Sequence, residues 1–394
     1  MILERVIKMN KENLIKTHKE LFGVEPQTTI LSPSRINIIG EHIDYLGGNV
    51  LPANIDLYMM GTFSKSDCFE IYSDNFQDAG IRKVEDQKNF KYDKTRGFLN
   101  YVLGCVQILR DNNFEVGGVS VAVSSIIPPS SGLSSSASFG VLIIKGLLKV
   151  YGYEVNGIEV AKLFKEVENK FMNLKNGIMD QFIIANGIEN NLMLLNTSTL
   201  QFSNYEINLG DYQFVVFNTK KQRDLVGSKY NERVEETSKG LELINQTNAY
   251  ENLTSIPLNK LDNELEKISD EIIKKRVKFA VEEQNRVNDF ISLLPLNDYV
   301  AMGKILNEGH KGLKELYEVS CDESDFIVDQ ANAIDGILGA RMTGAGFGGC
   351  VIVLTHKNSV KKLEQELVKK YNDKFGYPCE MYVIKVVDCA KDIN

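Results

Sequence analysis

The pattern of apolar and polar positions along the 394-residue chain predicts a mixture of helices and strands. Residues 138–151 form a long apolar run that predicts a buried helix. Apolar side chains recur at helical spacing in three further segments of the first half, 3–22, 95–112 and 157–174. Runs typical of strands occupy residues 29–40, 49–63, 68–73, 116–125 and 191–196, and Pro33 interrupts the first of them.

The second half of the chain differs because it is helix-rich and charged from about residue 222 to 333. Strand-like runs flank this stretch at 213–218, 350–355 and 380–387, and a helix is predicted over 358–372. Since strands and helices mix without strict alternation, we expect an α+β protein with two lobes. The length also favours two domains, which we place at 1–208 and 209–394.

Composition limits the classes of partner. Hydrophobic residues make up 43% and charged residues 25% of the chain, which is typical of a folded protein. The net charge of -8 disfavours general binding to nucleic acids or anionic membranes, but it leaves room for a local phosphate pocket. The six cysteines form no CxxC pair, and no run approaches the length of a membrane span. We therefore expect a monomeric cytoplasmic protein with reduced thiols that binds small molecules.

Residues 128–138 carry the first group of residues with recognisable chemistry, Pro-Pro-Ser-Ser-Gly-Leu-Ser-Ser-Ser-Ala-Ser. A flexible linker or a helix cap could use the same residue types. However, the segment lies between a predicted strand and a predicted helix, where Gly132 and the free N–H groups of the helix start would form a cradle for an anion. The candidate phosphate-binding residues are Pro129, Ser130, Ser131, Gly132, Leu133, Ser134, Ser135, Ser136 and Ala137.

Residues 34–48 form a second candidate site because polar and charged groups crowd a stretch that is otherwise apolar or glycine. These groups are Arg35, Glu41, His42, Asp44 and Tyr45. Carboxylates beside an imidazole suit a ligand rich in hydroxyl groups, since one carboxylate can accept from two hydroxyls. A surface turn with solvated charges explains these residues equally well, so their chemistry alone decides nothing.

Two further segments contain candidate residues. In 175–182, Asp180 is a single carboxylate in an apolar stretch, so it is either a helix cap or, if buried, paired or functional. In 342–350, three glycines formally match GxGxxG. A dinucleotide site would require a helix after this motif, whereas a strand is predicted there, so we interpret the segment as a glycine loop.

The segments resemble the conserved motifs of the GHMP kinases, in the same order. Pro-x-x-x-Gly-Leu-Ser-Ser-Ser-Ala resembles the phosphate motif of these kinases, and Arg-x-Asn-x-Ile-Gly-Glu-His-x-Asp-Tyr resembles the signature of the galactokinase family. The resemblance implies a two-lobed GHMP kinase fold, with an N-terminal lobe like domain 2 of ribosomal protein S5 and an α/β C-terminal lobe. It also implies an active site in the cleft between the lobes, with ATP and Mg²⁺ as cofactors.

The resemblance also implies roles for individual residues. Asp180 would be the general base, and Arg35 beside it would favour its charged form. Ser136 and Glu168 would bind Mg²⁺, while the glycine loop with Gly344, Gly346 and Gly348 would pack near the phosphate site. The residues implied for sugar binding are Glu41, His42, Asp44, Asp180 and Tyr230.

The activity implied by the resemblance is ATP-dependent phosphorylation of the C1 hydroxyl of galactose, which yields galactose 1-phosphate and ADP in the Leloir pathway. Two departures concern the sugar, since galactokinases commonly have Thr in place of Ile43 and Asn in place of Leu46. Ile at position 43 also occurs in the related N-acetylgalactosamine kinases, so phosphorylation of N-acetylgalactosamine is one alternative activity. A non-catalytic galactose sensor is another, but the presence of Ser136 and Ala137 favours an enzyme.

Overall fold

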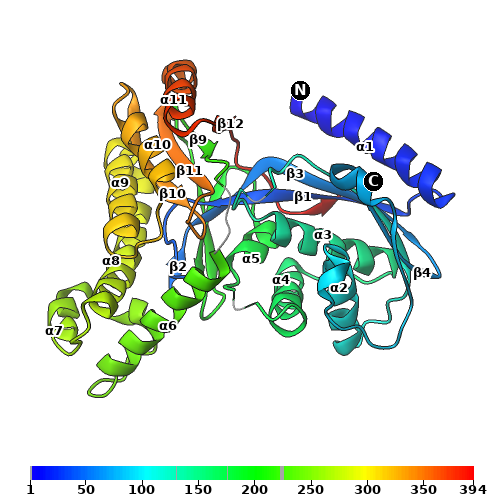
Figure 1. Ribbon diagram of the computed structural model, residues 1–394, viewed down its shortest axis with the longest axis horizontal. Coiled ribbons are helices and arrows are strands. Elements are labelled where there is room, and N and C mark those ends of the chain that lie inside the picture. The colour runs from blue at the N-terminus through cyan, green and yellow to red at the C-terminus, as the bar shows by residue number, and fades with distance from the viewer. Residues whose placement is uncertain (1, 130, 175, 222–225) are drawn as a thin grey trace.

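The computed structural model describes residues 2–129, 131–174, 176–221 and 226–394. Two lobes, each containing a β-sheet, lie side by side (Figure 1). Helices and strands are mixed without strict alternation, so the predicted α+β class with two lobes is confirmed. The division at residue 208 stays a prediction.

The first lobe is built on a six-stranded sheet with the order β13-β1-β3-β6-β4-β5. Its strands are β1 (Thr28–Asn37), β3 (Pro52–Lys65), β4 (Cys68–Ser73), β5 (Arg82–Glu85), β6 (Val119–Ser125) and β13 (Lys391–Asp392). The register between β1 and β3 shifts between Pro33 and Ser34. Proline is tolerated at such a bulge because it has no N–H to donate, so β1 bends at Pro33 rather than ending there.

Helices cover both faces of this sheet (Figure 1). One face carries α2 (Leu99–Asp111), α3 (Ser135–Val150), α4 (Gly157–Glu166) and α5 (Met179–Asn186). The opposite face carries α1 (Ile2–Phe22), where Leu14 packs with Leu31, Met60 and Ala122. Most of α3 is buried, as its apolar sequence predicts. The helix predicted over 157–174 is interrupted, because a π-helical turn (Val167–Phe171) follows α4.

The remaining strands form two smaller sheets. The three-stranded sheet contains β2 (Asn49–Val50), β7 (Asn191–Asn196) and β8 (Phe202–Glu206). The second lobe has the order β10-β11-β9-β12, with β9 (Tyr212–Asn218), β10 (Ile337–Thr343), β11 (Cys350–His356) and β12 (Glu380–Val383). The sequence patterns missed β5, β8, β10 and β13. The strand predicted over 380–387 was too long, since β12 ends at Val383.

The helices of the second lobe are α6 (Val226–Ile244), α7 (Leu261–Leu265), α8 (Glu271–Leu293), α9 (Tyr299–Glu315), α10 (Asp322–Asn332) and α11 (Val360–Phe375). Short 3₁₀ turns occupy Asp74–Ala79, Lys94–Arg96, Leu253–Ser255, Leu258–Lys260, Leu294–Leu296 and Lys357–Ser359. After β12 the chain returns to the first lobe, where Val386 bridges to Ile55 and β13 pairs with β1. The C-terminal end therefore lies against the first lobe (Figure 1).

A buried charge network connects the two lobes. Glu283 of α8 accepts hydrogen bonds from the backbone N–H groups of Gly40 (2.9 Å) and Glu41 (3.2 Å), which follow β1. Arg341 of β10 lies 3.6 Å from a carboxylate oxygen of Glu41 and 3.6 Å from one of Glu283. Burial would raise the pKa of Glu283, but the charges of Arg286 and Arg341 outweigh burial and lower it. The second lobe thus fixes the segment after β1.

We predict that Arg341→Met lowers the free energy of unfolding by about 3–5 kcal/mol, because it leaves the buried carboxylate of Glu41 without its ion-pair partner and removes one of the two cations beside Glu283. Urea denaturation of the wild type and the variant would measure this. The matched control is Arg96→Met, which removes an ion pair at the surface, where the side chain of the partner Asp93 is 45% exposed, and should cost less than about 1 kcal/mol. Equal losses in both variants would contradict a stabilising role of the network.

Candidate active site

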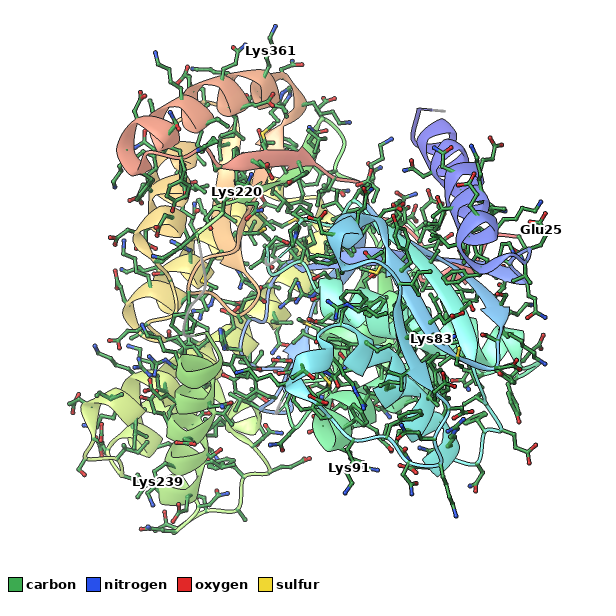
Figure 2. All side chains as sticks on the ribbon, turned by 45° about the vertical axis from the view of Figure 1, so that its right-hand side comes forward. Glu25, Lys83, Lys91, Lys220, Lys239 and Lys361 are labelled. Carbon is green, nitrogen blue, oxygen red and sulfur yellow. The ribbon has the colours of Figure 1, made fainter. Side chains whose placement is uncertain are left out.

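A cleft of about 620 Å³ brings most of the predicted site residues together. Its lining includes Arg35, Glu41, His42, Asp44, Gly132, Ser134, Ser135, Ser136, Glu168, Asp180, Tyr230 and Gly344. Arg35 is the one basic side chain among the described lining residues, whereas four of them are carboxylates. The lysines labelled in Figure 2 are exposed on the surfaces of the lobes and do not line the cleft. The cleft therefore gathers several carboxyl groups whose oxygens could bind a cation.

Arg35 and Asp180, predicted as the catalytic pair, form a bidentate ion pair. Arg35 Nε donates to Asp180 Oδ1 at 2.6 Å, and Nη2 donates to Oδ2 at 2.7 Å. The third bond of the guanidinium group joins Nη1 to the carbonyl oxygen of Gly132 in the phosphate loop (2.9 Å). Burial opposes the charge of Arg35, but the charge of Asp180 outweighs burial and raises the pKa of Arg35. One side chain thus connects the carboxylate with the phosphate loop.

The phosphate loop is divided between cleft and core. Gly132 and Ser134 to Ser136 line the cleft, and they precede or begin α3. Ser131, Leu133 and Ala137 are buried, and Pro129 is exposed. Ser130 lies outside the described residues. The N-terminal end of α3 thus borders the cleft, where its free N–H groups favour an anion.

Glu168 lies in the π-helical turn after α4, a feature that often marks functional positions. It is 4% exposed, and one carboxylate oxygen accepts a bond from Asn176 Nδ2 at 3.3 Å. Burial, together with the negative charge of Asp180, raises the pKa of Glu168 to about 8. The carboxylate of Glu168 and the hydroxyl of Ser136 line the same cleft and are oxygen donors of the kind that Mg²⁺ prefers. Both residues therefore fit a magnesium site.

The side chain of Asp44 lies against the backbone of Gly177, three residues before Asp180 in the chain. A Cβ atom at Gly177 would be 1.7 Å from Asp44 Oδ2, so a larger residue here would displace the Asp44 side chain from its present position. Burial and the nearby charge of Asp180 raise the pKa of Asp44 to about 6. Gly177 was not assigned a role from the sequence, although it stands in the same Gly-Ile-Met-Asp segment as Asp180.

His42 is held by a chain of hydrogen bonds. Its Nδ1 lies 3.1 Å from Tyr45 Oη, and its Nε2 lies 3.2 Å from the carbonyl oxygen of Ala345. Tyr45 Oη in turn lies 2.6 Å from Tyr317 Oη, and the Tyr230 ring packs 5.6 Å from the imidazole. Burial lowers the pKa of His42 to about 3, so the ring is neutral and donates from Nε2. Both ring nitrogens are therefore bonded to protein atoms.

The glycine loop joins the cleft through Gly344. Its N–H donates to Glu41 Oε1 at 2.7 Å, so the loop holds a carboxylate that was predicted to bind sugar. The predicted residues Gly346 and Gly348 are not among the lining residues of the cleft. A Cβ atom at Gly346 would be 2.2 Å from the carbonyl oxygen of Val319, so this glycine allows the loop to pack against the segment between α9 and α10 of the same lobe.

Comparisons with known proteins agree with this geometry. The family models for the "GHMP kinases N terminal domain" and "GHMP kinases C terminal" match residues 100–187 and 290–373. The "galactokinase galactose-binding signature" matches residues 16–65. A galactokinase of Staphylococcus carnosus is 37% identical over 377 residues, which cover 95% of this chain and 97% of that protein. The chain belongs to the galactokinase family. A galactokinase of Streptococcus suis is 38% identical over 98% of this chain and all of that protein.

Solved structures extend the comparison. The structure of Lactococcus lactis galactokinase complexed with galactose superimposes with a TM-score of 0.93 at 33% identity, covering 97% of this chain and 99% of that one. Methanococcus jannaschii mevalonate kinase, at 24% identity and a TM-score of 0.66, shares the fold. The signature of the galactokinase family includes Arg35, Glu41, His42 and Asp44, and the N-terminal domain model includes Asp180. In the described residues, no helix has the length and apolar character of a membrane span.

We predict that Asp44→Asn changes the pH dependence of stability. The pKa of Asp44 rises on folding from an ordinary 3.8 to about 6. The folded protein therefore binds this proton more tightly, and the contribution of Asp44 to the free energy of unfolding falls as the pH rises from about 4 to about 6. Relative to the wild type, Asp44→Asn should gain stability across this window. Urea denaturation at several pH values, without sugar, would test this, and curves that stay parallel would contradict the cause given for the pKa.

Proposed function

We propose that this member of the galactokinase family transfers the γ-phosphoryl group of ATP to the C1 hydroxyl of galactose, giving galactose 1-phosphate and ADP. The observation that carries the proposal is the bidentate pair of Arg35 and Asp180, which also bonds Gly132 of the phosphate loop. A base for the acceptor hydroxyl thus lies directly beside a cradle for the donor phosphates. Positioning and electrostatic stabilisation of this kind account for most catalysis of phosphoryl transfer.

In the proposed reaction the C1 hydroxyl oxygen forms a bond to the γ-phosphorus, and the bond from phosphorus to the β–γ bridging oxygen breaks. The hydroxyl proton passes to the carboxylate of Asp180, and ADP leaves with the bridging oxygen. Arg35 orients the carboxylate, and its positive charge stabilises negative charge on the transferring group. The N–H groups at the start of α3 receive the phosphates.

We assign Mg²⁺ binding to Ser136 and Glu168, which supply oxygen donors in a cleft lined by several carboxyl groups. When bound, the ion would neutralise charge on the phosphate oxygens. The described residues contain no cluster of three or more His, Cys, Asp or Glu side chains arranged for a metal. This supports a site completed by phosphate oxygens and water, which is usual for Mg²⁺.

For the sugar we propose contacts from Asp44, Glu41 and Tyr230, which line the cleft beside Asp180. Glu41 uses its oxygens for bonds with Gly344 and Asn37, yet a carboxylate has further lone pairs for sugar hydroxyls. His42 also lines the cleft, and both of its ring nitrogens are bonded to protein atoms, at Tyr45 and in the glycine loop. We propose that it shapes the sugar site through these neighbours.

One observation favours galactose over N-acetylgalactosamine. Ile43, which raised the alternative, is fully buried and is not among the lining residues of the cleft. Leu46 likewise packs against the core rather than lining the cleft. The two departures from the usual signature therefore leave the described cleft surface unchanged. The presence of the whole catalytic set also favours an enzyme over a sensor that only binds sugar.

The test is ADP release with MgATP and a panel of galactose, N-acetylgalactosamine, glucose, galacturonate and arabinose. We expect strong turnover with galactose, and with the other sugars turnover at least tenfold weaker, since lost or clashing hydroxyl contacts in a polar pocket are costly. Preferred turnover of another sugar would overturn the galactose assignment. Binding of galactose without any turnover would instead identify a sensor.

We predict that Asp180→Asn keeps the fold and lowers kcat about a hundredfold or more, because it removes the general base. Steady-state kinetics with galactose and circular dichroism would check both parts. The matched control is Asp86→Asn, which alters an ion pair outside the cleft in which Arg110 Nη2 donates to both carboxylate oxygens, and it should leave kcat unchanged. Near-wild-type turnover of Asp180→Asn would remove this residue from its role.

A further inference from the structure

Ser134 occupies an unusual position where the phosphate loop enters α3. It is the N-cap residue of this helix, and such a serine normally uses its hydroxyl to accept a bond from the first turn. Here the hydroxyl makes no such bond. The backbone of Ser134 is left-handed, with φ 56° and ψ 42°, a conformation that favours glycine over residues with a side chain. Neither helix capping nor the backbone conformation therefore explains why this position is a serine.

The hydroxyl of Ser134 is directed to the carboxylate of Asp180 instead. Ser134 Oγ donates a short hydrogen bond to Asp180 Oδ2, the same oxygen that accepts from Arg35 Nη2. Asp180 Oδ1 accepts from Arg35 Nε. The carboxylate is thus fixed from two directions, by β1 through Arg35 and by the phosphate loop through Ser134. Since Ser134 is only 8% exposed, water competes weakly for this bond.

The loop around Ser134 is itself held in place. Ser34 Oγ donates to the carbonyl oxygen of Leu133 at 2.7 Å, and Cys350 Sγ donates to the carbonyl oxygen of Ser131 at 3.2 Å. Arg35 Nη1 donates to the carbonyl oxygen of Gly132. Three consecutive carbonyl groups before Ser134 are therefore bonded to other segments. These bonds fix the backbone that carries the Ser134 hydroxyl, so the hydroxyl can hold Asp180 in one orientation.

We propose that Ser134 is a positioning residue for phosphoryl transfer, whose hydroxyl orients the carboxylate of Asp180 and couples it to the conformation of the phosphate loop. This inference rests on the proposed function. Other charged and titratable groups act on the same carboxylate, namely Arg35, Asp44, Glu168 and Tyr230. Arg35 and Ser134 are the ones with hydrogen bonds to it in the described residues.

Steady-state kinetics would distinguish a positioning role of Ser134 from two simpler roles, nucleotide binding and support of the backbone. A serine that only binds nucleotide should affect the KM for ATP. A serine that only supports the backbone should be replaceable by glycine, which adopts a left-handed φ at no steric cost. A positioning serine should lower kcat when either Ala or Gly replaces it, with little change in the KM values.

The experiment compares Ser134→Gly, Ser134→Ala and the wild type with MgATP and galactose. We expect kcat to fall on the order of tenfold in both variants, as for loss of a hydrogen bond to a charged group, while both KM values stay within about twofold. The matched control is Ser120→Ala, which removes a hydrogen bond from Ser120 to Glu70 outside the cleft, and it should keep the wild-type kcat. In an Asp180→Asn background, Ser134→Gly should have almost no further effect on kcat.

Several outcomes would overturn the inference. These are full activity of Ser134→Gly, a rise in the KM for ATP at constant kcat, or an undiminished effect of Ser134→Gly in the Asp180→Asn background. A wild type that turns over no sugar would refute the proposed function, which is a separate result.

The contact between Ser134 and Asp180 is then tested by urea denaturation, where Ser134→Gly and Asp180→Asn should shift the midpoint of unfolding non-additively. Additive shifts would overturn the bond between the two side chains.

Discussion

The carboxylate of Glu283 determines where the sugar-binding segment lies, because it accepts the backbone N–H groups of Gly40 and Glu41 at the same oxygen. A helix of the second lobe thereby holds a loop of the first. Arg341 lies near both Glu283 and Glu41 and adds positive charge to both buried carboxylates, while Arg286 forms the closer ion pair with Glu283. Each member of this network would be costly alone, so the two lobes are stable in one relative arrangement, and the cleft depends on that arrangement.

Backbone strain gathers around the cleft that this arrangement creates. Three lining residues other than glycine, His42, Ser134 and Asn173, have left-handed φ angles of 61°, 56° and 57°. Such conformations persist only where neighbours compensate for them, and they tend to cluster at functional sites. His42 is compensated by bonds at both ring nitrogens, and Ser134 by its bond to Asp180. These left-handed backbone conformations therefore let the three residues line the cleft in orientations that a regular strand or helix would not allow.

Short-range patterns in the sequence predicted the segments that carry the chemistry, and their shared motif order predicted that Arg35, Asp180 and the phosphate loop would meet. The interruption predicted at Pro33 was wrong, because β1 continues through this proline with a shift in register. What the sequence could not reveal were partners far apart in the chain. Glu283 lies in a charged helical stretch and Arg341 in a segment for which no strand was predicted, and nothing local indicates that Arg341 pairs with both Glu283 and Glu41. The π-helical turn at Glu168 likewise continues a helical pattern, so only the three-dimensional packing distinguishes it.

The pairing of β13 with β1 has a consequence for the order in which the molecule is made. Leu31 pairs with Lys391, and Ile30 pairs with Asp392, so one edge of the first sheet is closed by residues that a ribosome adds after the whole second lobe. Until then β1 presents an open edge to the crowded cell, and open edges invite pairing with other chains. During synthesis of the second lobe, β1 of the first lobe can therefore pair with strands of other chains. This exposure ends when residues 391–392 are synthesised and pair with β1.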